Sequence, residues 1–141
     1  MKLGADHTFL ATDDIPARLR EVNDGRLADL VIVCTGAPPA LQQGLDSVDR
    51  GGTVLFFAPT EPGVNISVPV NDLFFRNDAT LTTTYAGAPG DLATALEMIG
   101  SGRVQVGQMI SHRLGLAEAG LGFKLTAEAG DSLKVIIQPQ K

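Results

Sequence analysis

The sequence has few cysteines, few basic residues and no long apolar run, and each shortage excludes a class of protein. Its single cysteine, Cys34, cannot form a disulfide within the chain, which favours a reducing compartment. The chain carries 11 Lys and Arg residues against 16 Asp and Glu residues, so its formal net charge is -5 and its isoelectric point is about 4.8. Because nucleic-acid binding needs clustered cations, we do not expect a nucleic-acid surface.

No apolar window reaches the length of a membrane span, and the segment Met1–Asp6 lacks the apolar centre of a signal peptide. We therefore expect a cytoplasmic protein that is neither exported nor inserted into a membrane. The hydrophobic content of 44% and the charged content of 19% are typical of a folded globular chain. A length of 141 residues suffices for one core, so we expect a single domain or pieces of two.

The most informative stretch of the sequence is an apolar run that ends in a small polar residue and a glycine. Leu30–Val33 are four aliphatic residues without polar alternation, which is typical of a parallel strand covered by helices on both faces. Thr35 and Gly36 end the run, and Pro38-Pro39 fits the first turn of a helix, where a missing N–H costs nothing. Open α/β sheets bind ligands at the carboxyl ends of such strands.

The rest of the chain alternates between strand-like and helix-like patterns, which predicts an α/β fold with a βαβ unit over residues 30–58. Apolar or β-branched runs predict strands near Phe9 and over residues 53–58, 79–86, 110–114 and 133–137. Helical spacing and capping residues predict helices that begin near Ile15, Pro38, Asn71, Pro89 and Ala117, the third of them capped by Asn71 or Asp72. In the helix from Pro89, we expect Leu92, Ala95, Leu96 and Ile99 to face inward. We also expect a helix to end just before Gly4 and the chain to turn over residues 49–52.

Several residues could carry chemistry, but a structural role explains each of them more simply. Cys34 ends a buried strand without an evident base nearby, so we expect a small core residue rather than a nucleophile. Asp13 and Asp14 precede a helix and are better explained as caps than as an acid–base pair. His112 alternates with apolar neighbours and is interpreted as a partly buried structural histidine, whereas His7 is expected in solvent.

Residues 64–70 alternate apolar and polar side chains and include Pro69, which cannot donate to a strand ladder. This pattern fits an edge strand, and edge strands invite partners. For Phe74 and Phe75, which follow this segment, we expect packing in the core or in a dimer rather than a ligand-binding patch.

Four segments occur in a distinctive order and spacing: Asp29-Leu-Val-Ile-Val-Cys-Thr-Gly36, Gly51-Gly-Thr-Val-Leu55, Ile110-Ser-His-Arg-Leu114 and Ser132-Leu-Lys-Val-Ile-Ile137. Together they resemble medium-chain zinc-type alcohol dehydrogenases, with the polyol and threonine dehydrogenase branch nearest. The resemblance extends over essentially the whole chain but matches only the C-terminal part of that family's longer chain. It implies a partial Rossmann domain with a doubly wound, mostly parallel sheet over residues 1–106, and a segment of the catalytic domain over residues 107–141.

Other parts of the family pattern have no counterpart in this sequence. The GroES-like domain with its zinc ligands is absent, and so are the first two Rossmann strands, G-x-G-x-x-G and the acidic residue that binds the ribose. One Cys and two His cannot form a four-ligand zinc site within this chain. The resemblance therefore implies a truncated dehydrogenase or one piece of an assembly, inactive by itself. The alternative is a non-catalytic Rossmann-like binding or dimerisation module.

The resemblance also implies a reaction, a cofactor and its binding residues. The reaction is hydride transfer between a secondary alcohol and the nicotinamide of NAD or NADP, with zinc polarising the alcohol oxygen. By resemblance, Thr35 and Gly36 lie beside the cofactor ribose, and backbone groups of residues 56–58 and 83–85 face the nicotinamide carboxamide. Lys134 lies near the pyrophosphate, where a cation is favourable; the alternative is that this lysine only reaches into solvent. These candidate cofactor-binding residues are Thr35, Gly36, Phe56, Phe57, Ala58, Thr83, Tyr85 and Lys134.

The resemblance implies protein partners as well. Ile66–Val70 resembles the strand that pairs across the dimer axis in this family, so we expect a homodimer or higher oligomer. A complementing N-terminal half is the second expected partner. Without the first strands of the family fold, an apolar edge of the strand at residues 30–33 is exposed, which should drive self-association or rearrangement.

Overall fold

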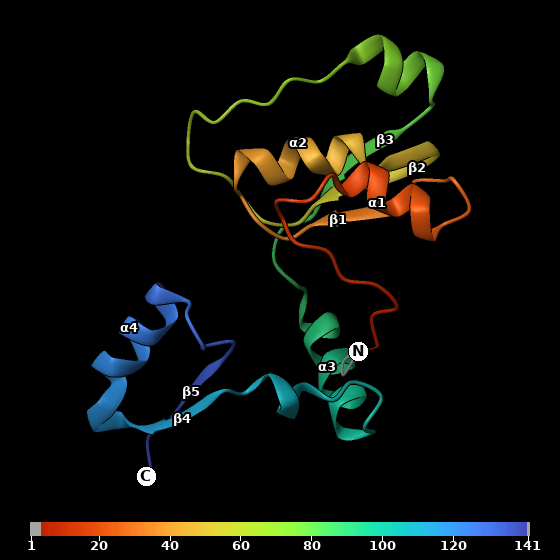
Figure 1. Cartoon of the computed structure of the whole chain (residues 1–141). Helices are drawn as coiled ribbons and strands as arrows, with labels where there is room; N and C mark the ends of the chain where they lie inside the picture. The colour runs from red at the N-terminus through yellow and green to blue at the C-terminus, as the bar shows by residue number, and fades with distance from the viewer. Residues whose placement is uncertain (1–3, 141) are drawn as a thin grey trace. The chain divides into compact units, whose positions relative to one another are not determined.

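The computed structural model describes residues 4–140, and these form two compact units, Met1–Ala86 and Gly87–Lys141 (Figure 1). The division predicted at residues 106 and 107 concerns the domains of the longer family chain and stays a prediction. No helix among residues 4–140 combines the length and the apolar character needed to cross a membrane.

The first unit contains a three-stranded parallel sheet in the order β1-β2-β3, formed by β1 (Ala28–Val33), β2 (Val48–Phe56) and β3 (Thr80–Thr83). The helix α2 (Pro38–Asp46) connects β1 to β2 and packs on the sheet (Figure 1). The predicted βαβ unit and the α/β fold class are therefore confirmed, and the parallel sheet is that of a partial Rossmann-like fold.

The core of the first unit lies between α2 and the sheet. Leu41 and Leu45 of α2 are 3% exposed, and Val54 in the central strand is completely buried. Gly44 permits this packing, because a Cβ atom there would lie 2.6 Å from Cγ2 of Val33. Burying one such Leu or Val side chain contributes about 1.5–3 kcal/mol to folding, so this cluster holds α2 on the sheet.

Only one face of β1 is covered in this way. Val31 and Val33 pack toward α2, whereas Leu30 and Ile32 on the opposite face are 57% and 51% exposed. The prediction of helices over both faces of this strand is therefore wrong for this unit. Cys34 is exposed too, so its assignment to the core is also wrong. An apolar run marks a strand able to be buried on both faces, but the covering layers come from other segments.

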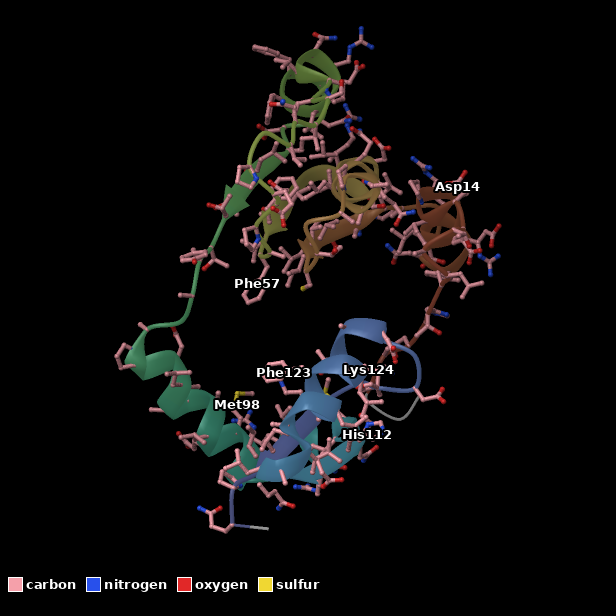
Figure 2. All side chains as sticks on the ribbon, turned by 90° about the vertical axis from the view of Figure 1, so that its left-hand side faces the viewer. Asp14, Phe57, Met98, His112, Phe123 and Lys124 are labelled. Carbon is pink, nitrogen blue, oxygen red and sulfur yellow. The ribbon has the colours of Figure 1, made fainter. Side chains whose placement is uncertain are left out.

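The helix α1 (Ile15–Val22) has the predicted cap, since the Asp14 carboxylate accepts a hydrogen bond from the Ala17 N–H at 3.1 Å (Figure 2). The strand expected near Phe9 does not form, and the Phe9 ring instead lies 5.5 Å from the Arg18 guanidinium. A strand needs a hydrogen-bonded neighbour, and this segment has none among the described residues. The helix end expected before Gly4 lies outside the described residues.

Two predicted features between β1 and β3 have a different form in the structure. The turn expected over residues 49–52 is an irregularity within β2, where Gly51 has a positive φ of 69° and the register with β1 shifts. Residues 64–69 are extended and alternate in burial as expected, but they pair with no strand among the described residues. The short helix follows as η1 (Asn71–Arg76), with Val70 at its N-terminal end instead of the predicted Asn71 or Asp72 cap.

The second unit contains α3 (Pro89–Gly100), η2 (Val106–Met109), β4 (His112–Gly115), η3 (Leu116–Glu118), α4 (Ala119–Glu128) and β5 (Val135–Gln138). The strands β4 and β5 are parallel, and α4 packs on them. Gly122 of α4 permits that contact, since a Cβ there would lie 3.0 Å from Cδ1 of Ile137. Leu92 and Leu96 of α3 are 63% and 70% exposed, so the prediction that they face inward is wrong.

Candidate functional site

The first unit has a cavity of about 350 Å³ at the carboxyl ends of β2 and β3. Its walls come from the segments that follow these strands, from the start of α2 and from the extended segment before η1. Ligands of open α/β sheets bind at this end of the strands. The lining residues are Leu41, Phe56, Phe57, Ala58, Pro59, Thr60, Val64, Ile66, Thr83, Thr84 and Tyr85.

Backbone hydrogen bonds hold the two main walls of the cavity in place. The Phe57 N–H donates to the Val33 carbonyl at 3.0 Å, and the Thr84 N–H donates to the Phe56 carbonyl at 3.4 Å. Both bonds continue the parallel ladders beyond the ends of the strands. The wall segments are therefore ordered by the sheet, although the Phe57 side chain itself is 53% exposed and points away from the sheet (Figure 2).

Gly36 fixes a third side of this region through a close backbone approach. A Cβ atom at Gly36 would lie 2.2 Å from the carbonyl oxygen of Pro59, a distance that no real side chain tolerates. The turn between β1 and α2 therefore contacts the loop after β2 directly, as only a glycine permits. Next to it, the Thr35 hydroxyl accepts a hydrogen bond from the Ala37 N–H at 3.3 Å, which shapes the same turn.

The structure brings most of the candidate cofactor-binding residues together. Phe56, Phe57, Ala58, Thr83 and Tyr85 line one cavity, and Gly36 abuts its Pro59 wall.

The remaining two candidates lie elsewhere. Thr35 lines a different groove, along the outer edge of β1. Lys134 belongs to the second unit, where its carbonyl accepts hydrogen bonds from Ser111 and His112. Their roles toward a cofactor stay predictions.

Sequence reasoning missed five lining residues: Leu41, Pro59, Thr60, Val64 and Ile66. A signal for two of them was present in the sequence, because the alternation over residues 64–70 identifies Val64 and Ile66 as inward-facing. Pro59 and Thr60 lie in the loop after β2, where a parallel sheet places its ligands. Leu41 joins the site only because α2 packs over the strand ends, which no local pattern reveals.

The cavity has the chemistry of a binding site. Its walls are mainly aromatic and aliphatic, with threonine hydroxyls from Thr60, Thr83 and Thr84, and Tyr85 is the only titratable side chain among the lining residues. A mostly apolar cavity with a few polar groups can hold a flat organic ring and orient it. It offers no carboxylate, amine or imidazole for general acid–base catalysis.

The described residues do not fit a zinc site. Nowhere in residues 4–140 do three or more His, Cys, Asp or Glu side chains gather as metal ligands would. Cys34 follows β1 in the first unit, and His112 lies on β4 in the second. A structural or catalytic zinc needs at least three protein ligands, and residues 4–140 do not bring such a set together.

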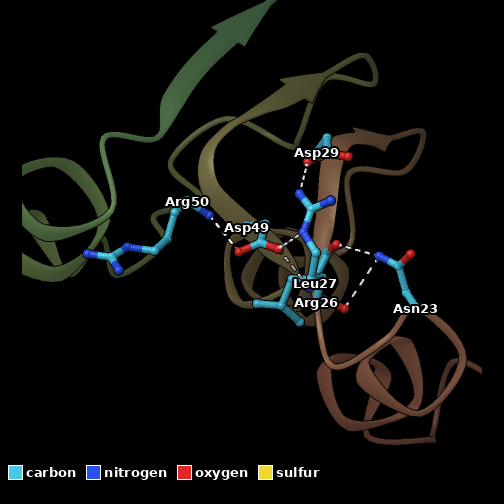
Figure 3. A network of polar contacts seen from close by, with 6 residues as sticks. All are labelled: Asn23, Arg26, Leu27, Asp29, Asp49 and Arg50. Carbon is cyan, nitrogen blue, oxygen red and sulfur yellow. Dashed lines mark hydrogen bonds and ion pairs between the residues drawn. The ribbon is translucent and has the colours of Figure 1, made fainter.

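The clearest polar network is structural and lies at the opposite end of β1 (Figure 3). Arg26 pairs with Asp29 and, at 3.3 Å, with Asp49. The Asp49 carboxylate also accepts hydrogen bonds from the backbone N–H groups of Arg50 and Leu27, at 2.8 and 3.1 Å. These hydrogen bonds, the one from Arg50 first, lower the pKa of Asp49, while the hydrogen bond to Asp29 is the main cause that raises the pKa of Arg26.

Known proteins similar to this chain are dehydrogenases. The sorbitol dehydrogenase of Halalkalibacterium halodurans is 26% identical over 142 residues, which cover 98% of this chain and 40% of that protein. The benzyl alcohol dehydrogenase structure from Acinetobacter calcoaceticus superposes with a TM-score of 0.82 at 23% identity, over 95% of this chain and 37% of that one. An NAD-dependent alcohol dehydrogenase structure gives a TM-score of 0.75 at 21% identity, over 96% and 38%. The two structures thus share the fold.

The family assignment comes from the match to a family model. The model described as zinc-binding dehydrogenase matches residues 1–101, which is more than half of the chain. The chain spans 40% or less of the length of these three relatives and corresponds to the C-terminal part of the longer family chain. The resemblance inferred from the four sequence segments is thereby confirmed, and the chain belongs to the zinc-binding dehydrogenase family.

Proposed function

We propose that residues 1–141 form the part of an NAD(P)-dependent, zinc-type alcohol or polyol dehydrogenase that receives the nicotinamide end of the cofactor. The cavity at the carboxyl ends of β2 and β3 carries this proposal, since its position in a parallel sheet is that of a cofactor site. The name of the similar sorbitol dehydrogenase favours a polyol, oxidised at a secondary alcohol, as substrate.

The residues of the cavity divide the binding task between apolar contact and hydrogen bonding. Phe56 and Tyr85 provide aromatic surface for the nicotinamide ring, while peptide groups after the strand ends, near Ala58 and Thr84, face the carboxamide. When bound, the nicotinamide supplies the hydride chemistry. Lys134 is proposed as a cation near the pyrophosphate.

This chain contributes binding and orientation rather than the reaction itself. Its sequence contains neither G-x-G-x-x-G nor a set of zinc ligands, and its cavity has no carboxylate, amine or imidazole. We therefore expect residues 1–141 alone to show no alcohol oxidation above background. A complementing N-terminal half is proposed to supply the missing groups, in line with the chain's coverage of 40% of the sorbitol dehydrogenase.

The test is a calorimetric titration of the 141-residue chain with NADH, together with two matched variants. Phe57 and Phe75 are both exposed phenylalanines of the first unit, 53% and 81% exposed, but only Phe57 lines the cavity. We expect Phe57→Ala to weaken NADH binding by about tenfold, about 1.4 kcal/mol, and Phe75→Ala to leave it unchanged. An absence of NADH binding by the folded chain, or equal losses in the two variants, would contradict the proposal.

A second candidate function is a dimerisation module, and the extended segment before η1 favours it. Val64, Ile66 and Val68 are half-buried, whereas Asn65 and Ser67 between them are exposed, and Val70 is 53% exposed. An extended segment without a strand partner among the described residues can pair with its copy in a second chain. We propose a homodimer, or a higher oligomer, built through Ile66–Val70.

Sedimentation equilibrium tests this second function. A dimer that dissociates on Ser67→Pro, which removes one N–H from this segment, supports pairing through it. A monomeric chain that is fully folded argues against it.

The cytoplasm is proposed as the location, since the single, exposed Cys34 suits a reducing compartment, and cell fractionation checks this.

A further inference from the structure

A pair of reactive side chains lies in the second unit, where β4 and β5 begin. Ser111 immediately precedes β4, whose first residue is His112, while Leu133 and Lys134 immediately precede β5. The Ser111 hydroxyl oxygen lies 3.0 Å from Nδ1 of His112. A hydroxyl within hydrogen-bond reach of an imidazole is the arrangement of a nucleophile and its base. Ser111 is exposed, so a reactant can reach its hydroxyl from solvent.

The surrounding hydrogen bonds decide where the Ser111 hydroxyl proton points. The N–H groups of Leu133 and Lys134 donate to the Ser111 oxygen, at 3.1 and 3.2 Å, and occupy both of its lone pairs. The proton has two acceptors within reach, Nδ1 of His112 and the Lys134 carbonyl, which lies 3.1 Å away. That carbonyl already accepts from the backbone N–H groups of Ser111 and His112, at 3.0 and 3.3 Å. The hydroxyl therefore donates to Nδ1, and His112 is a neutral imidazole with its proton on Nε2.

The same backbone groups favour the loss of this proton from Ser111. Two N–H donors on one oxygen stabilise the negative charge that forms when the hydroxyl gives its proton to His112. The pair thereby combines two conditions for an activated serine, an adjacent base and a stabilised alkoxide. A hydroxyl that only held β4 to β5 would use the two N–H bonds but would not require a base at Nδ1.

A cavity of about 220 Å³ adjoins the imidazole of His112. The end of α4 and the loop after it form the other walls, with the carboxylates of Glu128 and Asp131 and the apolar side chain of Leu125. The remaining lining residues are Gly130 and Ser132. Negative charge beside an imidazole stabilises its protonated form, so the two carboxylates favour proton uptake by His112. Lys124 offsets part of this charge, since its Nζ lies 3.8 Å from the Glu128 carboxylate.

The charges around the pair indicate the class of substrate. Two carboxylates next to the imidazole repel phosphate esters and other anions, so a neutral acyl compound fits this place better. The cavity is small, and Leu125 is the only large apolar side chain that lines it, so the acyl group that it accommodates is short. These features favour a neutral ester of a short carboxylic acid.

We infer that Ser111 and His112 form a nucleophile–base pair that transfers a short acyl group from a neutral ester to water. The Ser111 oxygen attacks the ester carbonyl carbon and its proton passes to Nδ1 of His112; the bond to the alcohol oxygen then breaks, and the alcohol takes up that proton. The acyl group stays on Ser111 until water, deprotonated by His112, attacks it, which releases the carboxylic acid and restores the hydroxyl. The reaction changes no oxidation state, and it uses no residue of the cavity at the ends of β2 and β3.

The experiment treats the 141-residue chain with p-nitrophenyl acetate, a neutral ester of a short acid. We expect p-nitrophenolate release above the rate in buffer. After an acid quench, mass spectrometry should find one acetyl group on Ser111, a product that a purely structural hydroxyl would not give. A folded chain without this acetyl group, or one acetylated on lysines alone, would overturn the inference. The readout does not involve NADH, so it is independent of the cofactor titration.

Matched variants identify the pair. Ser111→Ala should abolish the acetylation and the added release, whereas Ser111→Thr, which keeps a hydroxyl, should retain both. His112→Gln leaves the Ser111 hydroxyl with its two backbone donors and should slow release by at least about a hundredfold, because it removes the base. The control is His7→Gln at the other histidine, which is exposed in the first unit and should leave the rate unchanged.

The comparison of the two histidine variants also provides the contrary results. An unchanged rate in His112→Gln would overturn the inference, and so would equal losses in His112→Gln and His7→Gln, since any surface imidazole would then account for the reaction. Ser111→Ala leaves the N–H groups of Leu133 and Lys134 without their acceptor, so circular dichroism checks its fold. If it does not fold, His112→Gln and the acetyl group mapped on the unsubstituted chain decide.

Discussion

The two units of this chain differ most in how much apolar surface they bury. The seven buried apolar side chains among the described residues all belong to the first unit, where α2 packs on a three-stranded sheet. In the second unit the buried residues are Gly115 and Gly122, and large apolar side chains such as Phe123 are 79% exposed. Two strands and one helix bury too little to form a strong core. Stability therefore resides in the first unit.

The largest effect is expected from the core of the first unit. Leu45→Ala should lower the free energy of unfolding by about 2–5 kcal/mol, because it leaves a cavity under α2. Leu30→Ala, on the open face of β1, should cost less than about 1 kcal/mol, since Leu30 is 57% exposed. Urea denaturation measures both, and similar losses would contradict the difference between the two faces of β1.

A smaller effect is expected at the close approach of Gly36 to Pro59. Gly36→Ala places a Cβ where the Pro59 carbonyl lies, so the loop must shift, at a cost of about 1–3 kcal/mol. Because Pro59 lines the cavity, this variant should also weaken NADH binding. Thermal unfolding and calorimetry check the two effects, and unchanged stability would show that the loop adjusts freely.

A gain in stability, and not a loss, is expected when a glycine of the second unit is replaced by alanine. Gly120 lies within α4, and a Cβ added there has no neighbour within 4 Å. Gly120→Ala should raise the free energy of unfolding of this unit by about 0.5–1 kcal/mol through helix propensity and reduced chain entropy. Hydrogen exchange of the α4 amides measures it, with the exposed loop variant Gly130→Ala as a comparison. A loss of protection in α4 would contradict the open packing.

The smallest effect concerns Asp49 and acid pH. The hydrogen bonds from Arg50 and Leu27 lower the pKa of Asp49 below its ordinary value of 3.8. A lowered pKa in the folded state contributes stability above pH 3.8, which is lost as the pH falls through the folded value. Asp49→Asn should lack this acid-dependent loss, whereas Asp46→Asn should retain it. Denaturation midpoints between neutral pH and about pH 3 provide the comparison.

Local patterns in the sequence predicted the elements well where local physics decides them. The Asp14 cap, the helix from Pro38 and the strands predicted at residues 30–33 and 53–58 depend on caps, proline positions and apolar runs. The cap and the helix form, and strands form at both places with other bounds, as β1 (Ala28–Val33) and β2 (Val48–Phe56). The same kind of pattern failed near Phe9, because a strand also requires a neighbour. Five of the eight candidate cofactor-binding residues line one cavity, since residues after parallel strands converge at one end of a sheet.

By itself the sequence determined the α/β class, the βαβ unit and the family, because periodicity, caps and matched segments are properties of the chain read in order. Only the tertiary structure decided which side chains and strand edges are covered by other elements. It left Leu30, Ile32 and Cys34 exposed, brought Leu41 to the cavity and left one edge of β1 open. The reason is physical: a strand's pattern states which faces can be buried, but the layers that bury them come from elsewhere.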